Sequence, residues 1–186
     1  MAQVCSTSRH RAPALWLRWL SLSLLIVACL ACWAGSATAA TVDDAVLDRG
    51  AADFALPTLT GPNIRLSEAR GEVVLLSFWS SWCGGCRAAL TRSGELATTY
   101  RSAGLRVIGV SLDDDRARAQ AFAQRYPSDY SQALDVKKSV AQAYRISSLP
   151  YFVLIDRNGV TRFVQSDALG LDNDALIKKL RSLLNE

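Results

Sequence analysis

Two cysteines separated by two glycines are the residues of this chain best suited to do chemistry. They lie in the run Trp82-Cys83-Gly84-Gly85-Cys86. A cysteine thiolate attacks disulfide bonds, and a second thiol nearby can resolve the mixed disulfide that forms. As a structural cross-link the pair would close almost no loop, and such a disulfide adds little stability. The spacing therefore favours redox chemistry over a structural role.

Other uses of this cysteine pair lack the residues that they need. A zinc site takes four ligands, and the chain's only histidine is His10, while Cys5, Cys29 and Cys32 are also close to the N-terminus. Haem attachment requires a histidine directly after the second cysteine, where Arg87 stands. The missing histidine also argues against a cysteine–histidine hydrolase. The sequence predicts no metal site and no cofactor.

A buried strand and a helix are predicted on either side of the cysteines. Residues 73–79 are a continuous apolar run of strand length, typical of a strand at the centre of a sheet. A loop follows, and from Gly85 the sequence predicts a helix that runs toward Tyr100. Free N–H groups and the helix dipole would stabilise a thiolate placed just before that helix. We therefore assign Cys83 as the nucleophile and Cys86 as the resolving thiol.

The remaining patterns predict an α/β fold. They indicate a small hairpin over 52–66, strands over 105–111 and 131–134, helices over 115–126, 136–144 and 171–184, and a hairpin that pairs 151–155 with 160–164. This order describes a mixed sheet covered by helices on both faces. We expect one domain over 51–186 after a flexible lead-in over 41–50. The run Asp113-Asp114-Asp115 is interpreted as a solvated loop or a helix start.

Residues 1–40 have the pattern of an export signal. They carry Arg9, Arg11 and Arg18 but no acidic residue, and residues 19–42 hold no charge. The apolar run 20–32 and the small residues 37–40 complete the three regions of a signal peptide. Retention as a membrane anchor and lipidation at Cys29 are alternatives. All three predict export to the periplasm or cell envelope.

The charge of the chain comes largely from this N-terminal segment. Its three arginines account for part of the 21 basic residues, so 18 remain against 17 acidic residues. No block of like charge is left to bind nucleic acid. We expect no nucleic-acid partner, and membrane contact only through the N-terminal segment if it is retained.

Several short motifs surround the cysteine pair: Phe78-Trp79 ahead of Trp82-Cys83, Val107-Ile108-Gly109-Val110-Ser111, Ser147-Ser148-Leu149-Pro150, Phe152-Val153-Leu154-Ile155-Asp156 and Gly159. Through these motifs the chain resembles the TlpA/ResA-like thiol–disulfide oxidoreductases of the thioredoxin superfamily over about residues 50–185. This resemblance implies a thioredoxin-like three-layer fold with an N-terminal hairpin extension. It also implies an exported reductase of protein disulfides that receives electrons from a membrane-bound donor and serves cytochrome c maturation or metal-site assembly.

The same resemblance implies a substrate-binding surface beside the catalytic cysteines Cys83 and Cys86. The Leu149–Pro150 bond is expected to be cis and to face the cysteine pair. The backbone of Leu149 would then pair with an extended substrate segment, and we expect Trp82 to shield one side of the disulfide. Trp82, Leu149 and Pro150 are therefore the predicted substrate-binding residues.

Four positions depart from that family's pattern. Gly85 stands where proline is common, and Ser77 stands where thioredoxin carries a buried aspartate. Ala89 and Thr91 replace an acid and a helix proline of some ResA-like proteins. No buried carboxylate can therefore be carried over as a proton acceptor, which leaves Ser77, backbone groups and water.

Two other functions stay open at this point. A peroxiredoxin shares the fold and an opening segment similar to residues 53–57. Neither cysteine of this chain, however, lies in the Pro-x-x-x-Thr/Ser-x-x-Cys loop of that family. A non-catalytic module that holds Cu(I) on two thiolates, or grips peptides, is the other alternative. Its copper form is weakened because Met1 is the only methionine.

Overall fold

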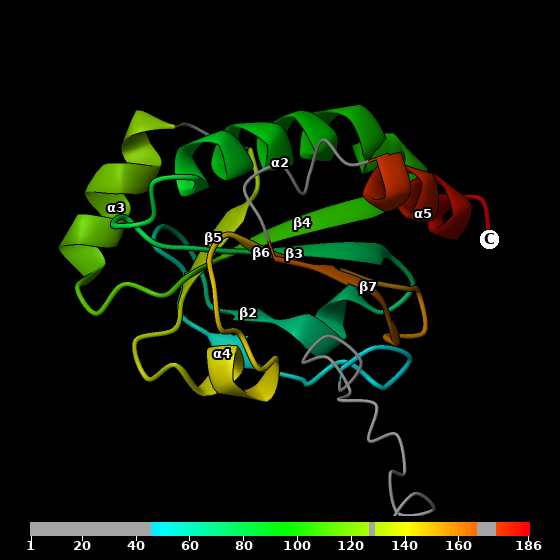
Figure 1. Cartoon of the computed structure of the whole chain (residues 1–186), viewed down its shortest axis with the longest axis horizontal. Coiled ribbons are helices and arrows are strands. Elements are labelled where there is room, and N and C mark those ends of the chain that lie inside the picture. Colours follow the sequence, from blue (N-terminus) through cyan, green and yellow to red (C-terminus); the bar gives the residue numbers. More distant parts are fainter. Residues whose placement is uncertain (1–45, 127–128, 167–173) are drawn as a thin grey trace, which may run out of the picture. The chain divides into compact units, whose positions relative to one another are not determined.

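A mixed sheet with strand order β5-β4-β3-β6-β7 is the centre of this structure, a computed structural model that describes residues 46–126, 129–166 and 174–186 (Figure 1). The strands are β3 (Val73–Trp79), β4 (Leu105–Ser111), β5 (Ser131–Leu134), β6 (Tyr151–Ile155) and β7 (Thr161–Gln165). Strands β3, β4 and β5 are parallel, whereas β6 runs antiparallel to β3 and β7 antiparallel to β6. Each strand lies within one or two residues of its predicted position.

Strand β3 lies in the middle of the sheet because its side chains are apolar on both faces. All seven of its residues are buried. Leu75 pairs with Val107 of β4 on one side and with Leu154 of β6 on the other. Alternate residues of β3 belong to separate core clusters, with Val74 on one face and Leu75 on the other. The strand therefore needs covering layers on both faces.

Helices and a hairpin provide these layers. Helices α2 (Cys86–Tyr100) and α5 (Asp174–Leu184) share a core cluster on one face of the sheet. Helix α4 (Ser139–Ala143) and the pair β1 (Ala55–Leu56) and β2 (Ile64–Arg65) lie against the other face. Figure 1 shows α2 and α5 above the sheet and α4 below it. The predicted three-layer fold with an N-terminal hairpin is confirmed.

Shorter elements complete the fold. Helix α3 (Arg116–Arg125) lies within the predicted range 115–126, and the 3-10 helices η2 (Leu66–Ala69) and η3 (Arg101–Ala103) follow β2 and α2. The helix predicted over 136–144 begins only at Ser139, because Lys138 has a left-handed φ of 57°.

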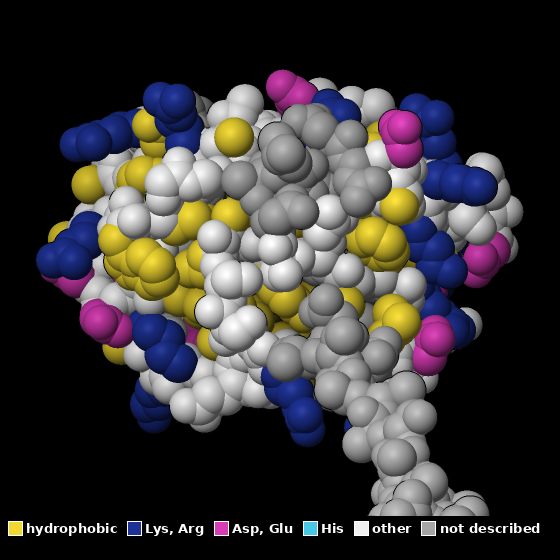
Figure 2. Space-filling model, viewed as in Figure 1, with side chains coloured by type: hydrophobic (Ala, Val, Ile, Leu, Met, Phe, Trp, Pro, Cys, Tyr) yellow, Lys and Arg dark blue, Asp and Glu magenta, His cyan; other side chains and the backbone are white. Residues whose placement is uncertain are grey.

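Figure 2 shows basic and acidic side chains interspersed around hydrophobic ones on one face of the described residues.

The N-terminal predictions fall outside the part of the chain that the structure describes. The export signal over 1–40 and the first half of the lead-in over 41–50 lie there, as does the start of the helix predicted over 171–184. No helix within the described ranges is long and apolar enough to cross a membrane.

Candidate active site

Cys83 and Cys86 are joined by a disulfide bond at the start of helix α2. Their Cα atoms are 5.4 Å apart, and a short loop connects Cys83 to the end of β3. Cys83 is 8% exposed, whereas Cys86 is completely buried. Cys83 is therefore the cysteine of the pair that offers surface to another molecule.

The backbone around the disulfide places Cys83 just before the helix, as predicted. The helix begins at Cys86, and Gly85 before it already has helical dihedral angles of −81° and −13°. The N–H of Cys86 donates to the carbonyl oxygen of Cys83 at 3.2 Å, and no side chain caps this end of the helix. A sulfur at this position lies close to the positive end of the helix dipole.

The disulfide packs within an apolar cluster. Both cysteines are buried with Leu59, Trp79, Leu90, Ala119 and Leu134, and half-buried side chains of α3 pack against them. Trp79 is fixed in this cluster because its ring stacks on Phe122 with centroids 5.6 Å apart. Its indole N–H also donates to Oε1 of Gln132 at 2.9 Å. Trp79 is thus a packing residue of the core.

The Leu149–Pro150 segment lies at the same end of the sheet as the cysteines. The peptide bond between these two residues is cis, as the resemblance implied. Pro150 is buried, and half-buried Leu149 packs against the cluster that contains Cys83 and Cys86. Strand β6 starts at the next residue, Tyr151, which pairs with Phe78 near the end of β3.

Trp82 presents a large apolar side chain to solvent next to Cys83. It is 68% exposed, and it is one of two large hydrophobic side chains exposed in the described residues. The ring is therefore accessible to another molecule. The expected shielding of the disulfide by Trp82 stays a prediction.

Ser77 occupies the place where thioredoxin carries a buried aspartate, and Ser93 bonds to it. The side chain of Ser77 lies on the face of β3 that α2 covers, and the Ser93 hydroxyl of α2 donates to its oxygen at 3.1 Å. Both serines are completely buried. This interior position therefore holds hydroxyl groups and no carboxylate.

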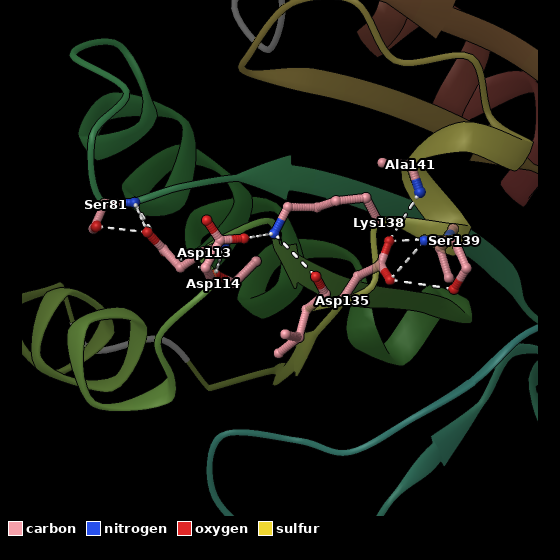
Figure 3. Close-up of polar contacts among 10 residues, drawn as sticks. Ser81, Asp113, Asp114, Asp135, Lys138, Ser139 and Ala141 are labelled. Atoms are coloured by element: carbon pink, nitrogen blue, oxygen red, sulfur yellow. Dashed lines mark hydrogen bonds and ion pairs between the residues drawn. The ribbon is translucent and has the colours of Figure 1, made fainter.

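A buried carboxylate does contact the loop before Cys83, and it comes from a different element. Asp113 follows β4, is 1% exposed, and accepts hydrogen bonds from Ser81 in the loop before Cys83 (Figure 3). The interpretation of residues 113–115 as a solvated loop is therefore wrong for Asp113. It is right for Asp114, which is exposed, and Asp115 caps α3 by accepting from the Ala117 N–H at 2.8 Å.

The comparisons with known proteins place the chain in a family. Residues 47–164 match the family model described as AhpC/TSA. The chain belongs to the AhpC/TSA family. This AhpC/TSA member is 34% identical over 109 residues to the thiol-disulfide oxidoreductase ResA of Geobacillus kaustophilus. That match covers 59% of this chain and 63% of the relative, so it spans less than two thirds of that protein.

Another relative and two solved structures extend this similarity. The chain is 29% identical to the thiol-disulfide oxidoreductase ResA of Halalkalibacterium halodurans over 143 residues, 76% of this chain and 81% of that protein. A candidate thiol:disulfide interchange protein DsbE from Chlorobium tepidum matches with a TM-score of 0.70 and 34% identity over 74% of this chain and 99% of its own. A candidate protein disulfide isomerase from Bacteroides thetaiotaomicron matches with a TM-score of 0.66 and 27% identity. This match covers 75% of this chain and 91% of that protein.

The structure of this AhpC/TSA member thus gathers the predicted site residues at one end of the sheet. These residues are Trp82, Cys83, Cys86, Leu149 and Pro150. The sequence reasoning missed Asp113, although a usable signal was present. Because the carboxyl ends of parallel strands meet at one edge of a sheet, an acid two residues after β4 falls beside the loop that leaves β3. Within the described ranges, no cluster of three or more His, Cys, Asp or Glu side chains could hold a metal ion.

Proposed function

We propose that this protein is a thiol–disulfide oxidoreductase that exchanges disulfides with other proteins through Cys83 and Cys86. The observation that carries the proposal is the disulfide at the start of α2, with Cys83 partly accessible and Cys86 fully buried. This asymmetry suits a pair in which one sulfur meets the substrate and the other acts only within the protein. The names of the ResA relatives agree with this chemistry.

The reaction passes two electrons and two protons from the dithiol to a substrate disulfide. The thiolate of Cys83 attacks one substrate sulfur, a mixed disulfide forms, and the other substrate sulfur leaves as a thiolate that takes a proton. Cys86 then loses its proton and attacks the sulfur of Cys83, which releases the second substrate thiol. The protein is left with the Cys83–Cys86 disulfide, and a dithiol donor must reduce it before the next cycle.

The surface around Cys83 supports a polypeptide as the substrate. Exposed Trp82 offers an apolar contact, and half-buried Leu149, just before β6, packs against the cluster that contains the cysteines. An extended chain can bind to such backbone by strand-like hydrogen bonds while side chains contact the aromatic ring. Trp82, Leu149 and Pro150 therefore form the substrate-binding surface in this proposal.

The cellular role in this proposal is that of an exported reductase in the cell envelope. Its substrates are disulfides of other envelope proteins, as in cytochrome c maturation or metal-site assembly, and a membrane-bound protein supplies the electrons. The signal-like residues 1–40 and the resemblance to TlpA/ResA-like proteins support this assignment. Whether the segment is cleaved, lipidated at Cys29 or retained decides how the protein meets its donor.

The first experiment is the redox equilibrium of the full-length protein in detergent against glutathione. Trypsin cleaves after Arg70 and Arg87, so both cysteines fall in one peptide, and the other three cysteines do not interfere. Alkylation followed by mass spectrometry of that peptide gives the oxidised fraction. A reduction potential near about −270 mV would support a reductase, and one near about −120 mV an oxidant. Failure to form a reversible Cys83–Cys86 disulfide would refute the proposal.

Cysteine variants separate the two sulfurs and test the alternatives. We expect Cys83→Ser to abolish reduction of a protein disulfide such as that of insulin, and Cys86→Ser to accumulate a mixed disulfide through Cys83. A peroxiredoxin would instead consume hydroperoxide with a thiol reductant. A copper module would bind Cu(I) one-to-one in its reduced form and exchange no disulfides. Either result, without disulfide exchange by the wild type, would replace the oxidoreductase assignment.

A further inference from the structure

Among the residues that the structure describes, Asp113 is the one buried carboxylate with a hydrogen bond to the loop leading to Cys83. We propose that it is a positioning residue for disulfide exchange, which holds this loop and makes the Cys83–Cys86 disulfide more stable against reduction. The inference rests on the proposed function, since it assigns a residue that sets the redox equilibrium of that same site.

Both carboxylate oxygens of Asp113 are occupied by donors from two neighbouring segments. The Ser81 hydroxyl donates to Oδ1 at 2.6 Å, and the Ser81 N–H donates to Oδ2 at 3.0 Å. The Ser111 hydroxyl at the end of β4 donates to Oδ2 at 2.9 Å. Figure 3 shows Asp113 and Ser81 facing each other across the gap between the two loops. Among the described residues no Lys or Arg side chain pairs with Asp113.

These contacts fix the peptide that carries the nucleophile. Ser81 lies two residues before Cys83, and the Cys83 N–H donates to the carbonyl oxygen of Ser80 at 3.3 Å. The residue before Asp113 makes a second link, since the Leu112 N–H donates to the carbonyl oxygen of Trp79 at 2.8 Å. The segment from Trp79 to Cys83 is therefore tied to the chain that follows β4 at two successive points.

Two physical effects of Asp113 act on the disulfide in the same direction. A fixed loop holds the Cys83 sulfur close to Cys86, so disulfide closure costs less entropy than in a loose loop. The Asp113 carboxylate is bonded to Ser81, two residues before Cys83, and a negative charge on this side of the loop would also disfavour the Cys83 thiolate and so make the reduced state less stable. Removing the hydrogen bonds should loosen the loop, and removing the charge should favour the Cys83 thiolate. Each change should therefore make the disulfide easier to reduce.

Asp114 provides a matched control on the same loop. It is the next residue, but its side chain is 89% exposed and pairs with Lys138 at 2.6 Å, away from Ser81. Asp114→Asn removes the same charge one residue further along without touching the loop of Cys83. Ser81→Ala removes one hydrogen bond to Asp113 and keeps its charge.

The test measures the glutathione equilibrium of the full-length wild type, Asp113→Asn, Ser81→Ala and Asp114→Asn. We expect Asp113→Asn to lower the equilibrium constant for disulfide formation about threefold to tenfold, which raises the potential by about 14 to 30 mV. Ser81→Ala should shift it in the same direction by about twofold, and Asp114→Asn should match the wild type. Alkylation of reduced Cys83 at a fixed pH should be faster in Asp113→Asn.

Each other result overturns the inference in a recognisable way. If Asp113→Asn and Ser81→Ala lose thermal stability but keep the wild-type potential, Asp113 is only structural. If Asp114→Asn shifts the potential as much as Asp113→Asn, the effect is a general one of charge. If Asp113→Asn does not fold, Ser81→Ala alone decides. A wild type without a reversible disulfide refutes the proposed function itself, and this inference with it.

Discussion

At the end of the sheet where β3, β4 and β5 finish, here termed the cysteine end, two buried carboxylates accept hydrogen bonds from backbone N–H groups and serine hydroxyls. Asp113 binds Ser81 and Ser111, and Asp135 accepts from the N–H groups of Ser139, Val140 and Ala141 (Figure 3). Within the described ranges neither carboxylate pairs with a cationic side chain. These bonds fix peptide segments directly.

At the opposite end, here termed the far end, carboxylates pair with arginine side chains instead. Glu72, just before β3, forms two hydrogen bonds of 2.7 Å with Arg106 of β4. Arg162 of β7 bridges Asp156 and Asp48 at 2.8 Å each. The pairs Glu72–Arg106 and Asp48–Arg162 join flexible side chains at a partly hydrated surface, where ion pairs contribute little free energy. Asp156 is the exception at this end, because it is 6% exposed and also accepts hydrogen bonds from the Asn158 and Val160 N–H groups.

Apart from Asp156, the far end therefore relies on pairs of side chains, whereas the carboxylates of the cysteine end hold the backbone directly. A hydrogen bond from a backbone N–H to a buried carboxylate leaves few alternative geometries, and its loss strands a buried donor. A surface ion pair can be lost while water takes its place. Substitutions at the two ends should therefore differ in cost.

The largest effect is expected at Asp135, which is completely buried at the cysteine end. Asp135→Ala leaves three backbone N–H groups of the first turn of α4 without their acceptor, and we expect a loss of about 3 kcal/mol in the free energy of unfolding. Urea unfolding followed by tryptophan fluorescence measures it. Asp135→Asn is the control, because it keeps one acceptor oxygen and should lose less. A loss below about 1 kcal/mol for Asp135→Ala would contradict the comparison.

A smaller effect, and a dependence on pH, is expected at Asp156 of the far end. Burial acts to raise the pKa of Asp156, but hydrogen bonds from the Val160 N–H, from Arg162 and from the Asn158 N–H hold it below its ordinary value. Because the pKa is lower in the folded state, Asp156 stabilises the fold above the unfolded pKa of about 3.9. This contribution is lost as the pH falls through the folded pKa.

Asp156→Asn tests this contribution directly. We expect Asp156→Asn to lower the free energy of unfolding by about 1 to 2 kcal/mol at pH values of about 7. The gap between the free energies of unfolding at about pH 7 and at about pH 2 should then be smaller in the variant than in the wild type. Part of the gap should remain, because the pKa values of Asp53 and Asp114 are also lowered. An unchanged gap in the variant would show that Asp156 does not carry this dependence.

The smallest effect is expected at Glu72 of the far end. Its side chain and that of Arg106 are 37% and 38% exposed, so water and salt screen the pair. We expect Glu72→Gln to cost at most about 1 kcal/mol, and added salt to reduce the difference from the wild type. Urea unfolding at low and high salt checks this. A cost as large as that of Asp135→Ala would remove the contrast between the two ends.

Local patterns were sufficient to predict most of the fold. The run Val73–Trp79 is apolar at almost every position, and a strand with two buried faces is the structure that such a run forms in an α/β sheet. The start of α4 was missed by three residues, because Asp135 turns inward to accept its N–H groups and Lys138 takes a left-handed conformation. Such a cap depends on where the preceding strand places the aspartate.

The sequence by itself determined the cysteine pair, the helix that follows it and the strands of the sheet, whereas the place of Leu149 and Pro150 beside the cysteines was implied by the family resemblance. These features follow from short-range spacing and from hydrophobic periodicity, which act within one element. Only the tertiary structure decided which of three successive aspartates is buried. Asp113 meets Ser81, 32 residues away, because parallel β3 and β4 end side by side, and that neighbourhood is not written in either segment alone.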